Sequence, residues 1–144
     1  MIVITPTEAV SGTYRGAVLA LDDFPDADIR VIDSRTVASG LGSLVLQAHQ
    51  WAKQGLDSAE IEKRVHGLAK QQKVYFMVDT LEFLHKGGRI GGAAALIGSI
   101  LQVKPILTIK DGRVDTADKQ QTKKKAIAEL IDLVIADSHE TYLL

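Results

Sequence analysis

The sequence contains no cysteine and few aromatic residues. Without cysteine the chain has no disulfide, no thiolate nucleophile and no thiolate metal site. The same absence fits a reducing compartment, so we expect a cytoplasmic protein. Aromatic residues make up 5% of the 144 residues, although hydrophobic residues make up 46%. Alanine, leucine, isoleucine and valine must therefore build the core, and this composition suits helices packed on a sheet.

The chain also lacks an excess of charge and a long apolar run. Its formal net charge is −1, which argues against the strongly basic face that nucleic-acid binding usually needs. No apolar run is long enough to span a bilayer. Residues 1–6 lack the basic start and apolar stretch of a signal peptide and instead predict a short buried strand. Because a strand rarely opens a domain without a lead-in, this start suggests a missing upstream segment.

The first half of the sequence alternates predicted strands and helices. Three short apolar runs predict buried strands at residues 2–5, 29–32 and 74–78. Apolar residues at helical spacing predict helices at residues 11–23, at residues 39–54, and from a cap at Asp57 or Ser58 onward. The order strand, helix, strand, helix, helix, strand is typical of a parallel α/β sheet with flanking helices.

The second half has a different pattern. Asp111-Gly112 is a strong hairpin signal and joins predicted strands at residues 104–110 and 113–117. Helices are predicted at residues 80–84, 91–101 and 121–136. The side chains expected on the core face of the last helix are Ala126, Ile127, Leu130, Ile131 and Val134. The change of pattern predicts two α/β units, residues 1–86 and 87–144, each part of a lobe.

Two stretches could bind an anion near the start of a helix or the end of a strand. Ser11-Gly12 offers a hydroxyl and backbone N–H groups at a predicted helix start, where the helix dipole favours carboxylate or phosphate. The alternative is that Ser11 is only an N-cap, and the local sequence alone favours the cap. Asp33-Ser34 follows a predicted strand, where ligands gather in parallel sheets, but a turn together with the cap of the next helix is the more common role for these residues.

Gly87-Gly88-Arg89 is a third candidate. Two glycines allow a sharp turn close to a ligand, and Arg89 offers a planar fork of donors suited to an oxyanion. A helix C-cap followed by a surface arginine explains the same residues equally well.

Catalytic and metal motifs are missing. The sequence has no G-x-S-x-G, P-loop or G-x-G-x-x-G motif, and no nucleophile comes with an identifiable base. None of the four histidines has zincin-type spacing, so we expect no metal site. Lys123, Lys124 and Lys125 are most simply a solvated first helical turn.

Several of these stretches, in this order, resemble the DegV family. The resemblance covers nearly the whole chain, and its specificity comes from the order and spacing of motifs that are weak alone. The matching stretches are Ser11-Gly12-Thr13-Tyr14-Arg15-Gly16-Ala17, Val31-Ile32-Asp33-Ser34, Ser39-Gly40-Leu41-Gly42, Thr80-Leu81-Glu82-Phe83-Leu84, Gly87-Gly88-Arg89-Ile90, Lys104-Pro105-Ile106-Leu107, Asp111-Gly112 and Lys123-Lys124-Lys125-Ala126.

The resemblance implies a two-domain α/β fold that binds a long-chain fatty acid and presents it to a separate ATP-dependent fatty acid kinase. The chain would then be a binding component and not an enzyme, with no cofactor. Carried over to this sequence, Ser11 and Gly12 would bind the carboxylate, and Arg89 would neutralise or orient it. 

The same resemblance implies an acyl tunnel walled by the helix predicted at residues 91–101. The tunnel-lining residues would be Ile90, Leu96, Ile97 and Ile100. The small residues Gly92, Ala94, Ala95 and Gly98 would leave room for the chain, although close helix packing explains them as well.

The sequence departs from the family at both ends. Family members are longer, and their ligand-contacting Thr-Ser motif and head-group histidine have no counterpart here, so we expect a fragment truncated at both ends. Gln121 also stands where members often carry arginine before Thr122. Truncation would expose apolar surface and favour self-association.

Two other functions stay open. Anion-binding helix starts and an arginine also suit a phosphotransferase-like or sugar-phosphate-binding enzyme domain. Alternatively, Lys119 and residues 123–125 would dock an acidic partner in a module without ligand.

Overall fold

The computed structural model describes residues 1–98 and 103–140. Contacts divide the chain into two compact units, Met1–Gln72 and Lys73–Leu144. The division falls earlier in the chain than the boundary predicted after residue 86, because strand β3 (Tyr75–Met77) is hydrogen-bonded into the sheet of the second unit. Each unit has its own core, so each is described by itself.

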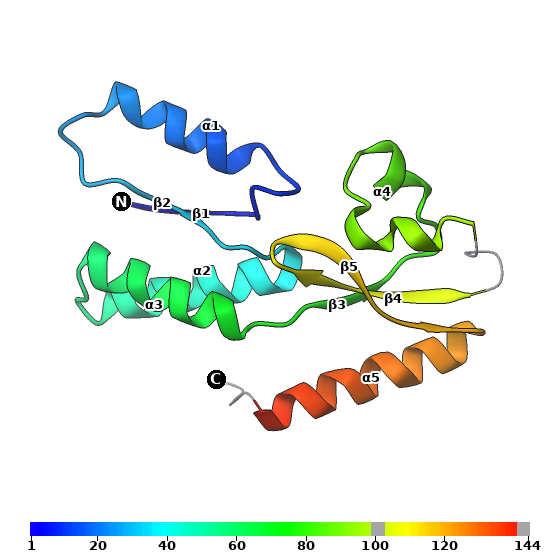
Figure 1. Cartoon of the computed structure of the whole chain (residues 1–144). Coiled ribbons are helices and arrows are strands. Elements are labelled where there is room, and N and C mark those ends of the chain that lie inside the picture. The colour runs from blue at the N-terminus through cyan, green and yellow to red at the C-terminus, as the bar shows by residue number, and fades with distance from the viewer. Residues whose placement is uncertain (99–102, 141–144) are drawn as a thin grey trace. The chain divides into compact units, whose positions relative to one another are not determined.

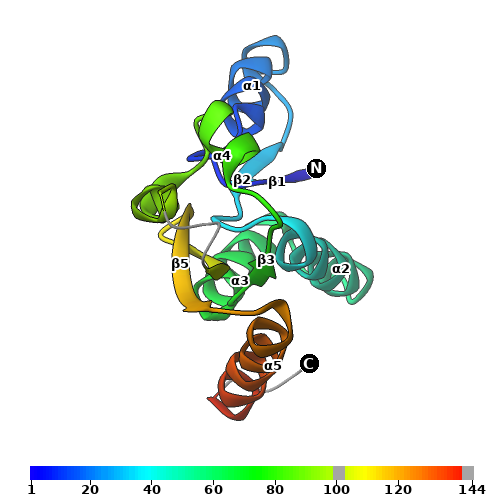
Figure 2. The ribbon, with the colours of Figure 1, turned by 90° about the vertical axis from the view of Figure 1, so that its right-hand side faces the viewer.

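The first unit is a parallel strand pair covered by helices on both faces (Figures 1 and 2). Strand β1 (Ile2–Thr5) pairs with β2 (Arg30–Asp33) in a register that places Thr5 beside Asp33. Helix α1 (Thr13–Leu19) and the 3-10 helix η1 (Ala20–Asp23) cover one face; α2 (Ala38–Lys53) and α3 (Ser58–Gln71) cover the other. The core residues are Ile32, Leu44, Ala48, Ile61 and Val65. The predicted parallel α/β arrangement is confirmed for β1 and β2.

Helix α2 ends and helix α3 begins close to the residues that the sequence predicts. Gly55 has a φ of +85°, a left-handed conformation that suits glycine after a helix C-terminus. Asp57 then caps α3, since its carboxylate accepts a hydrogen bond from the Glu60 N–H at 2.8 Å.

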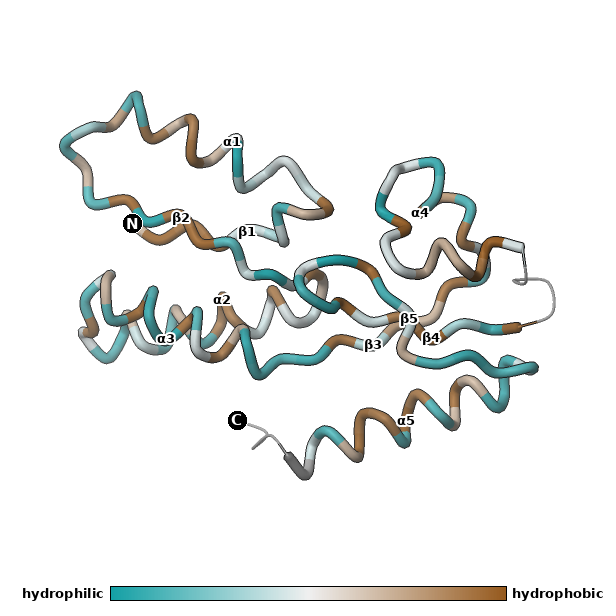
Figure 3. Tube along the Cα trace, viewed as in Figure 1, coloured by the Kyte–Doolittle hydropathy of each residue, from teal (hydrophilic) through white to brown (hydrophobic). Residues whose placement is uncertain are grey.

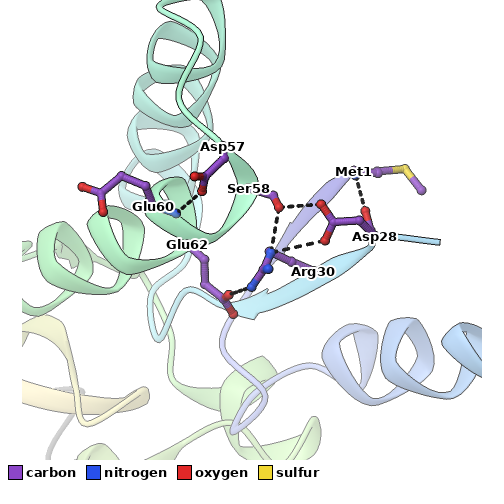
Figure 4. Close-up of polar contacts among 7 residues, drawn as sticks. All are labelled: Met1, Asp28, Arg30, Asp57, Ser58, Glu60 and Glu62. Carbon is purple, nitrogen blue, oxygen red and sulfur yellow. Dashed lines mark hydrogen bonds and ion pairs between the residues drawn. The ribbon is translucent and has the colours of Figure 1, made fainter. Parts of the chain in front are cut away.

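A polar network joins β2 to the start of α3 (Figure 4). The Arg30 guanidinium donates to Glu62 at 2.6 Å and to the Ser58 hydroxyl at 2.9 Å, and Ser58 donates to Asp28 at 2.5 Å. The Ser58 hydrogen bond lowers the pKa of Asp28, and the Glu62 hydrogen bond raises the pKa of Arg30. The N-terminal ammonium of Met1 donates to the Asp28 carbonyl. These groups satisfy one another, so they fix the edge of the parallel pair.

The second unit contains a three-stranded antiparallel sheet in the order β3-β4-β5. Strands β4 (Lys104–Lys110) and β5 (Arg113–Gln120) form the predicted hairpin, whose turn has positive φ at both Asp111 (+50°) and Gly112 (+78°). A bulge between Ile106 and Leu107 shifts the register of the pair. The hairpin prediction is confirmed.

The pairing of strand β3 differs from the predicted topology. The sequence places residues 74–78 as the third strand of the parallel sheet, but β3 pairs antiparallel with β4, with Phe76 opposite Leu107. An apolar run of this kind fits either sheet, so periodicity alone could not choose between them.

The helices of the second unit also differ in part from prediction. Helix α4 (Glu82–Lys86) ends at Gly87 as expected, but the segment predicted as a helix over residues 91–101 begins as a 3-10 helix, η2 (Gly91–Leu96). Residues 99–102 lie outside the described part of the chain. The core residues are Leu81, Ala93, Leu96, Leu107 and Val114.

Helix α5 (Lys123–Glu140) packs on this sheet through one narrow face. Ala126 is fully buried as predicted, but Ile127, Ile131 and Val134 are 45%, 50% and 48% exposed, so their predicted core role is wrong. A sheet of three strands covers only one side of the helix, and Figure 3 shows hydrophobic segments recurring along it. Self-association through exposed apolar surface stays a prediction, and this row of side chains is one place to test it.

Near its C-terminal end, α5 is tied to β3 by polar groups. The Tyr75 hydroxyl and the Lys73 ammonium both donate to the Asp137 carboxylate, each at 2.5 Å. Burial and the Asp137 hydrogen bond raise the pKa of Tyr75 to about 12. Burial opposes ionisation of Asp137, but the hydrogen bonds from Lys73 and Tyr75 outweigh it and lower the pKa of that carboxyl.

The shifted pKa of Tyr75 makes stability depend on alkaline pH. Its contribution is complete below the ordinary tyrosine pKa of about 10 and is lost as pH rises through about 12, because the folded state holds the phenolic proton more tightly. We therefore expect the free energy of unfolding to fall more steeply between these pH values in the unaltered protein than in Tyr75→Phe. Urea denaturation at several pH values measures this, and equal slopes in both proteins would contradict the assignment.

A buried side chain of β4 and a half-exposed side chain of α5 should differ in how much stability is lost when each is replaced by alanine. Leu107, in strand β4 of the hairpin, is fully buried in the core of the second unit, so Leu107→Ala should lower the free energy of unfolding by about 2–5 kcal/mol. Ile131→Ala, at a half-exposed site, should lower it by less than about 1 kcal/mol. Denaturant titration of both variants is the measurement, and a larger loss for Ile131→Ala would show that this face is covered in solution.

Candidate functional site

In the first unit, Ser11 lies at the end of the loop that follows β1. Its N–H and that of Val10 donate to the Thr7 carbonyl at 3.1 and 3.2 Å, which closes a compact turn over residues 7–11. Thr7 in turn donates its N–H to the Thr36 carbonyl at 2.9 Å. The position of Ser11 is therefore fixed by the turn that follows β2, and not by α1 alone.

Buried hydroxyl side chains fill the space where the two strands end. Each is less than 5% exposed, although threonine and serine are mostly surface residues; they are Thr5, Thr7, Ser34 and Thr36. The Thr5 hydroxyl donates to the Ile32 carbonyl, and the Ser34 hydroxyl donates to the Thr36 carbonyl, both at 3.2 Å. These bonds satisfy polar groups inside the unit, so this cluster is a support for the loops.

The Ser11 hydroxyl is half-buried and engaged by Thr13. The Thr13 N–H donates to Ser11 Oγ at 3.3 Å, and the two hydroxyl oxygens are 2.7 Å apart. When the Thr13 hydroxyl is the donor of that pair, Ser11 Oγ accepts both bonds and its own proton is directed to an outside acceptor. This geometry suits a ligand that accepts hydrogen bonds, such as an anion.

The N-cap alternative for Ser11 is only partly met. Gly12, not Ser11, occupies the N-cap position of α1, and the Ser11 oxygen accepts from the second following residue, Thr13. Gly12 is exposed, so its backbone is accessible to a ligand. 

The Asp33-Ser34 stretch forms a turn, as the simpler interpretation predicts, but it does not cap the next helix, because the N-cap residue of α2 is Val37. Asp33 Oδ1 accepts from the Arg35 N–H at 2.9 Å and from the Glu8 N–H at 3.3 Å. Arg35 has a φ of +55°, a strained conformation for a residue with a side chain. The turn is therefore held by its surroundings.

In the second unit, Gly87 and Gly88 end α4 and turn the chain into Arg89. Gly87 is the C-cap residue and Gly88 has a φ of +73°. The Arg89 N–H donates to the Leu84 carbonyl at 2.8 Å, and its guanidinium donates to the Gly87 carbonyl. The C-cap interpretation is thus confirmed, and the exposed guanidinium sits at the end of a helix, where a cation is favoured.

The residues predicted to line a tunnel have different environments. Leu96 is 8% exposed and belongs to the core, Ile90 packs against that core, and Ile97 is 42% exposed. Ile100 lies outside the described residues. A tunnel along these residues stays a prediction.

The small residues of η2 serve close packing at two positions. A Cβ on Gly91, whose φ is +51°, would lie 2.0 Å from the Val114 carbonyl oxygen, and one on Gly92 would lie 2.2 Å from Asp115 Oδ1. Among the residues that the structure describes, a Cβ on Gly98 would meet no atom within 4 Å. Gly91 and Gly92 therefore let η2 approach β5, which supports the packing alternative for the first part of this segment.

Ser11 and Gly12 belong to the first unit and Arg89 belongs to the second. That these residues share one head group stays a prediction. Over residues 1–98 and 103–140 there is no cluster of three or more histidine or acidic side chains that could hold a metal ion. Within the same residues, no helix has the length and hydropathy needed to cross a membrane.

Comparison with known proteins decides the family. The DegV family model, described as "Uncharacterised protein, DegV family", matches residues 1–143. The chain belongs to the DegV family. A DegV domain-containing protein of Clostridium perfringens is 42% identical over 135 residues, which are 91% of this chain and 48% of that protein. This DegV chain thus spans about half the length of the curated relatives it matches.

Solved structures of DegV proteins confirm the predicted α/β fold. A fatty-acid-binding DegV family protein from Thermus thermophilus has 35% identity and a TM-score of 0.88, over 95% of this chain and 49% of that one. A stearic-acid-binding protein from Eubacterium ventriosum has 30% identity and a TM-score of 0.85, over 96% of this chain and 49% of that one.

Sequence patterns did not identify the residues that hold the Ser11 loop, residues 7–11, in place. Thr13 follows the Ser11-Gly12 pair and contacts the Ser11 hydroxyl, and Thr7 and Thr36 join two loops far apart in the chain. One available signal was the concentration of hydroxyl residues at or shortly after the ends of the first two predicted strands, at Thr5, Thr7, Ser34 and Thr36. 

The tight contact of η2 with β5 predicts a stability difference between two glycines. Gly91→Ala should lower the free energy of unfolding by about 1–3 kcal/mol, because the new methyl group meets the Val114 backbone and the positive φ is strained. Gly98→Ala is the matched control and should change stability little, because a Cβ at Gly98 meets no atom of residues 1–98 or 103–140 within 4 Å. Thermal denaturation compares them, and an equal shift in Tm for both variants would contradict the packing role.

Proposed function

We propose that this DegV chain holds a long-chain fatty acid and presents it to a separate ATP-dependent kinase. The similarity to fatty-acid-binding DegV proteins along almost the whole chain carries the proposal. The carboxylate would lie at Ser11, Gly12 and Arg89, and the acyl chain would lie along an apolar wall that includes Ile90, Leu96, Ile97 and Ile100.

The chemistry of the Ser11 loop supports a carboxylate ligand. The Thr13 N–H and hydroxyl can fill the acceptor positions of Ser11 Oγ, which leaves the Ser11 proton for the ligand. The Arg89 guanidinium supplies a charge that can pair with an ionised acid. Neither group is a nucleophile with a base beside it, so the proposed role is binding, with phosphoryl transfer performed by the partner.

The acyl tail should dominate affinity and the polar groups should dominate head-group placement. Each buried methylene contributes about 0.8 kcal/mol, so a tail of about sixteen carbons offers roughly 10 kcal/mol before ordering costs. A hydroxyl hydrogen bond contributes about 1 kcal/mol net, and a charge-assisted bond from arginine about 1.5–3 kcal/mol. Half-exposed Ser11 beside exposed Gly12 would keep the carboxylate accessible to a kinase.

Native mass spectrometry of the protein purified from cells tests lipid binding directly. We expect a co-purified mass corresponding to a long-chain fatty acid. A protein that carries no acid and takes up none from fatty acid supplied in vesicles would overturn the proposal.

Head-group variants test the division of labour between tail and polar groups. We expect Ser11→Ala and Arg89→Ala to reduce phosphorylation of the bound acid by an ATP-dependent fatty acid kinase more than they reduce retention of the lipid. Ser138→Ala is the control, because its hydroxyl donates within α5, to the Ile135 carbonyl at 2.7 Å, and the proposed site does not include Ser138. Equal losses of phosphorylation and of lipid retention would contradict this division.

A further inference from the structure

The Asp33 carboxylate joins the two loops that end the parallel strands. Asp33 is the last residue of β2, and its Oδ1 accepts two backbone N–H bonds. The bond from Arg35, at 2.9 Å, closes the turn after β2. The bond from Glu8, at 3.3 Å, comes from the turn that leads into Ser11.

The turn around Asp33 provides a rigid anchor. Ser34 is fully buried, its N–H donates to the Thr5 carbonyl at 3.2 Å, and its hydroxyl bonds Thr36. Arg35 is held at a φ of +55°. A turn fixed at so many points can hold a neighbouring loop in one position.

The loop that depends on this anchor carries Ser11. Glu8 directly follows Thr7, and the Thr7 carbonyl accepts the N–H groups of Val10 and Ser11. A displacement of Glu8 therefore moves the turn on which the Ser11 hydroxyl is mounted. Asp33 therefore acts through Glu8, which lies three residues before Ser11 in that loop, and Asp33 itself needs no contact with a ligand.

We propose that Asp33 is a positioning residue, whose carboxylate fixes the Ser11 hydroxyl for recognition of a fatty-acid head group. The inference rests on the proposed function. A negative side chain near a site for an anion would oppose binding unless its charge were engaged, and here it is engaged by two N–H donors. The oxygen acceptor, and not the charge, is then the required property.

Selectivity between a fatty acid and the matching alcohol measures this role. Binding of palmitic acid and of hexadecanol to the full chain is compared for the unaltered protein, Ser11→Ala, Asp33→Ala, Asp33→Asn and the Ser11→Ala/Asp33→Ala double variant. Ser11→Ala should lower the acid-to-alcohol affinity ratio about fivefold. Asp33→Ala should lower it by a similar factor, and the double variant by no more than either single one.

The conservative variant separates positioning from charge. Asp33→Asn keeps an oxygen at the same place and should retain the selectivity of the unaltered protein. Asp33→Glu keeps the charge but displaces the oxygens by one methylene, so it should lose selectivity as Asp33→Ala does and serves if the alanine variant does not fold. Asp132→Ala, on α5, is the control for loss of one carboxylate.

Two results would overturn the role of Asp33. One is an equal loss of acid and alcohol affinity in Asp33→Ala, which indicates general destabilisation. The other is an effect that adds to that of Ser11→Ala, which indicates independent action.

Backbone hydrogen exchange tests the positioning role of Asp33 even if the proposed function fails. If the unaltered protein binds neither ligand, or does not prefer the acid, the proposed function fails. Exchange at the Glu8 and Ser11 amides then decides the positioning role without a ligand. We expect both amides to exchange faster in Asp33→Ala than in Asp33→Asn, and unchanged exchange would overturn the role.

Discussion

Hydrogen bonds between two loops, at the point where the parallel strands end, set the geometry of the first unit. Thr7 bonds to Thr36, Ser34 bonds to Thr5, and Glu8 bonds to Asp33, so the segment that carries Ser11 is held by the turn after β2. These bonds lie among buried hydroxyl groups that would be costly to leave unpaired. A hydroxyl mounted on such a frame is preorganised, and preorganisation lowers the entropy lost when a ligand binds.

In the second unit, the segment around Arg89 is held in place by backbone contacts and helix-end hydrogen bonds. Its hairpin and the 3-10 helix η2 meet without side chains between them at Gly91, so the segment after Arg89 is anchored by backbone contact with β5. Arg89 itself is fixed by its N–H bond to Leu84 and by its guanidinium bond to Gly87. Under the proposed function, the Ser11 hydroxyl and the Arg89 guanidinium would be the groups that recognise an ionised acid.

Much of the local structure could be predicted from sequence, and little of the long-range structure. Asp57 and Gly55 mark helix ends, and Asp111-Gly112 marks the hairpin, because caps and tight turns depend on adjacent residues. The partner of β3 and the exposed side of α5 depend on segments far away, so apolar spacing could not reveal them. The candidate site shows the same division. Local sequence makes Ser11 and Arg89 candidates for anion binding and the family resemblance supplies their expected roles, whereas the proposed role of Asp33 depends on a contact between residues 25 positions apart.

The protonation state of a bound fatty acid tests the central claim, recognition of an ionised carboxylate, most directly. Carbon-13 NMR of carboxyl-labelled palmitic acid bound to the full chain would follow its titration. Donation from a hydroxyl and a guanidinium favours the ionised form, so the account predicts that binding lowers the carboxyl pKa and that Arg89→Ala raises it again. A carboxyl pKa raised by binding, and unchanged by Arg89→Ala, would contradict the account.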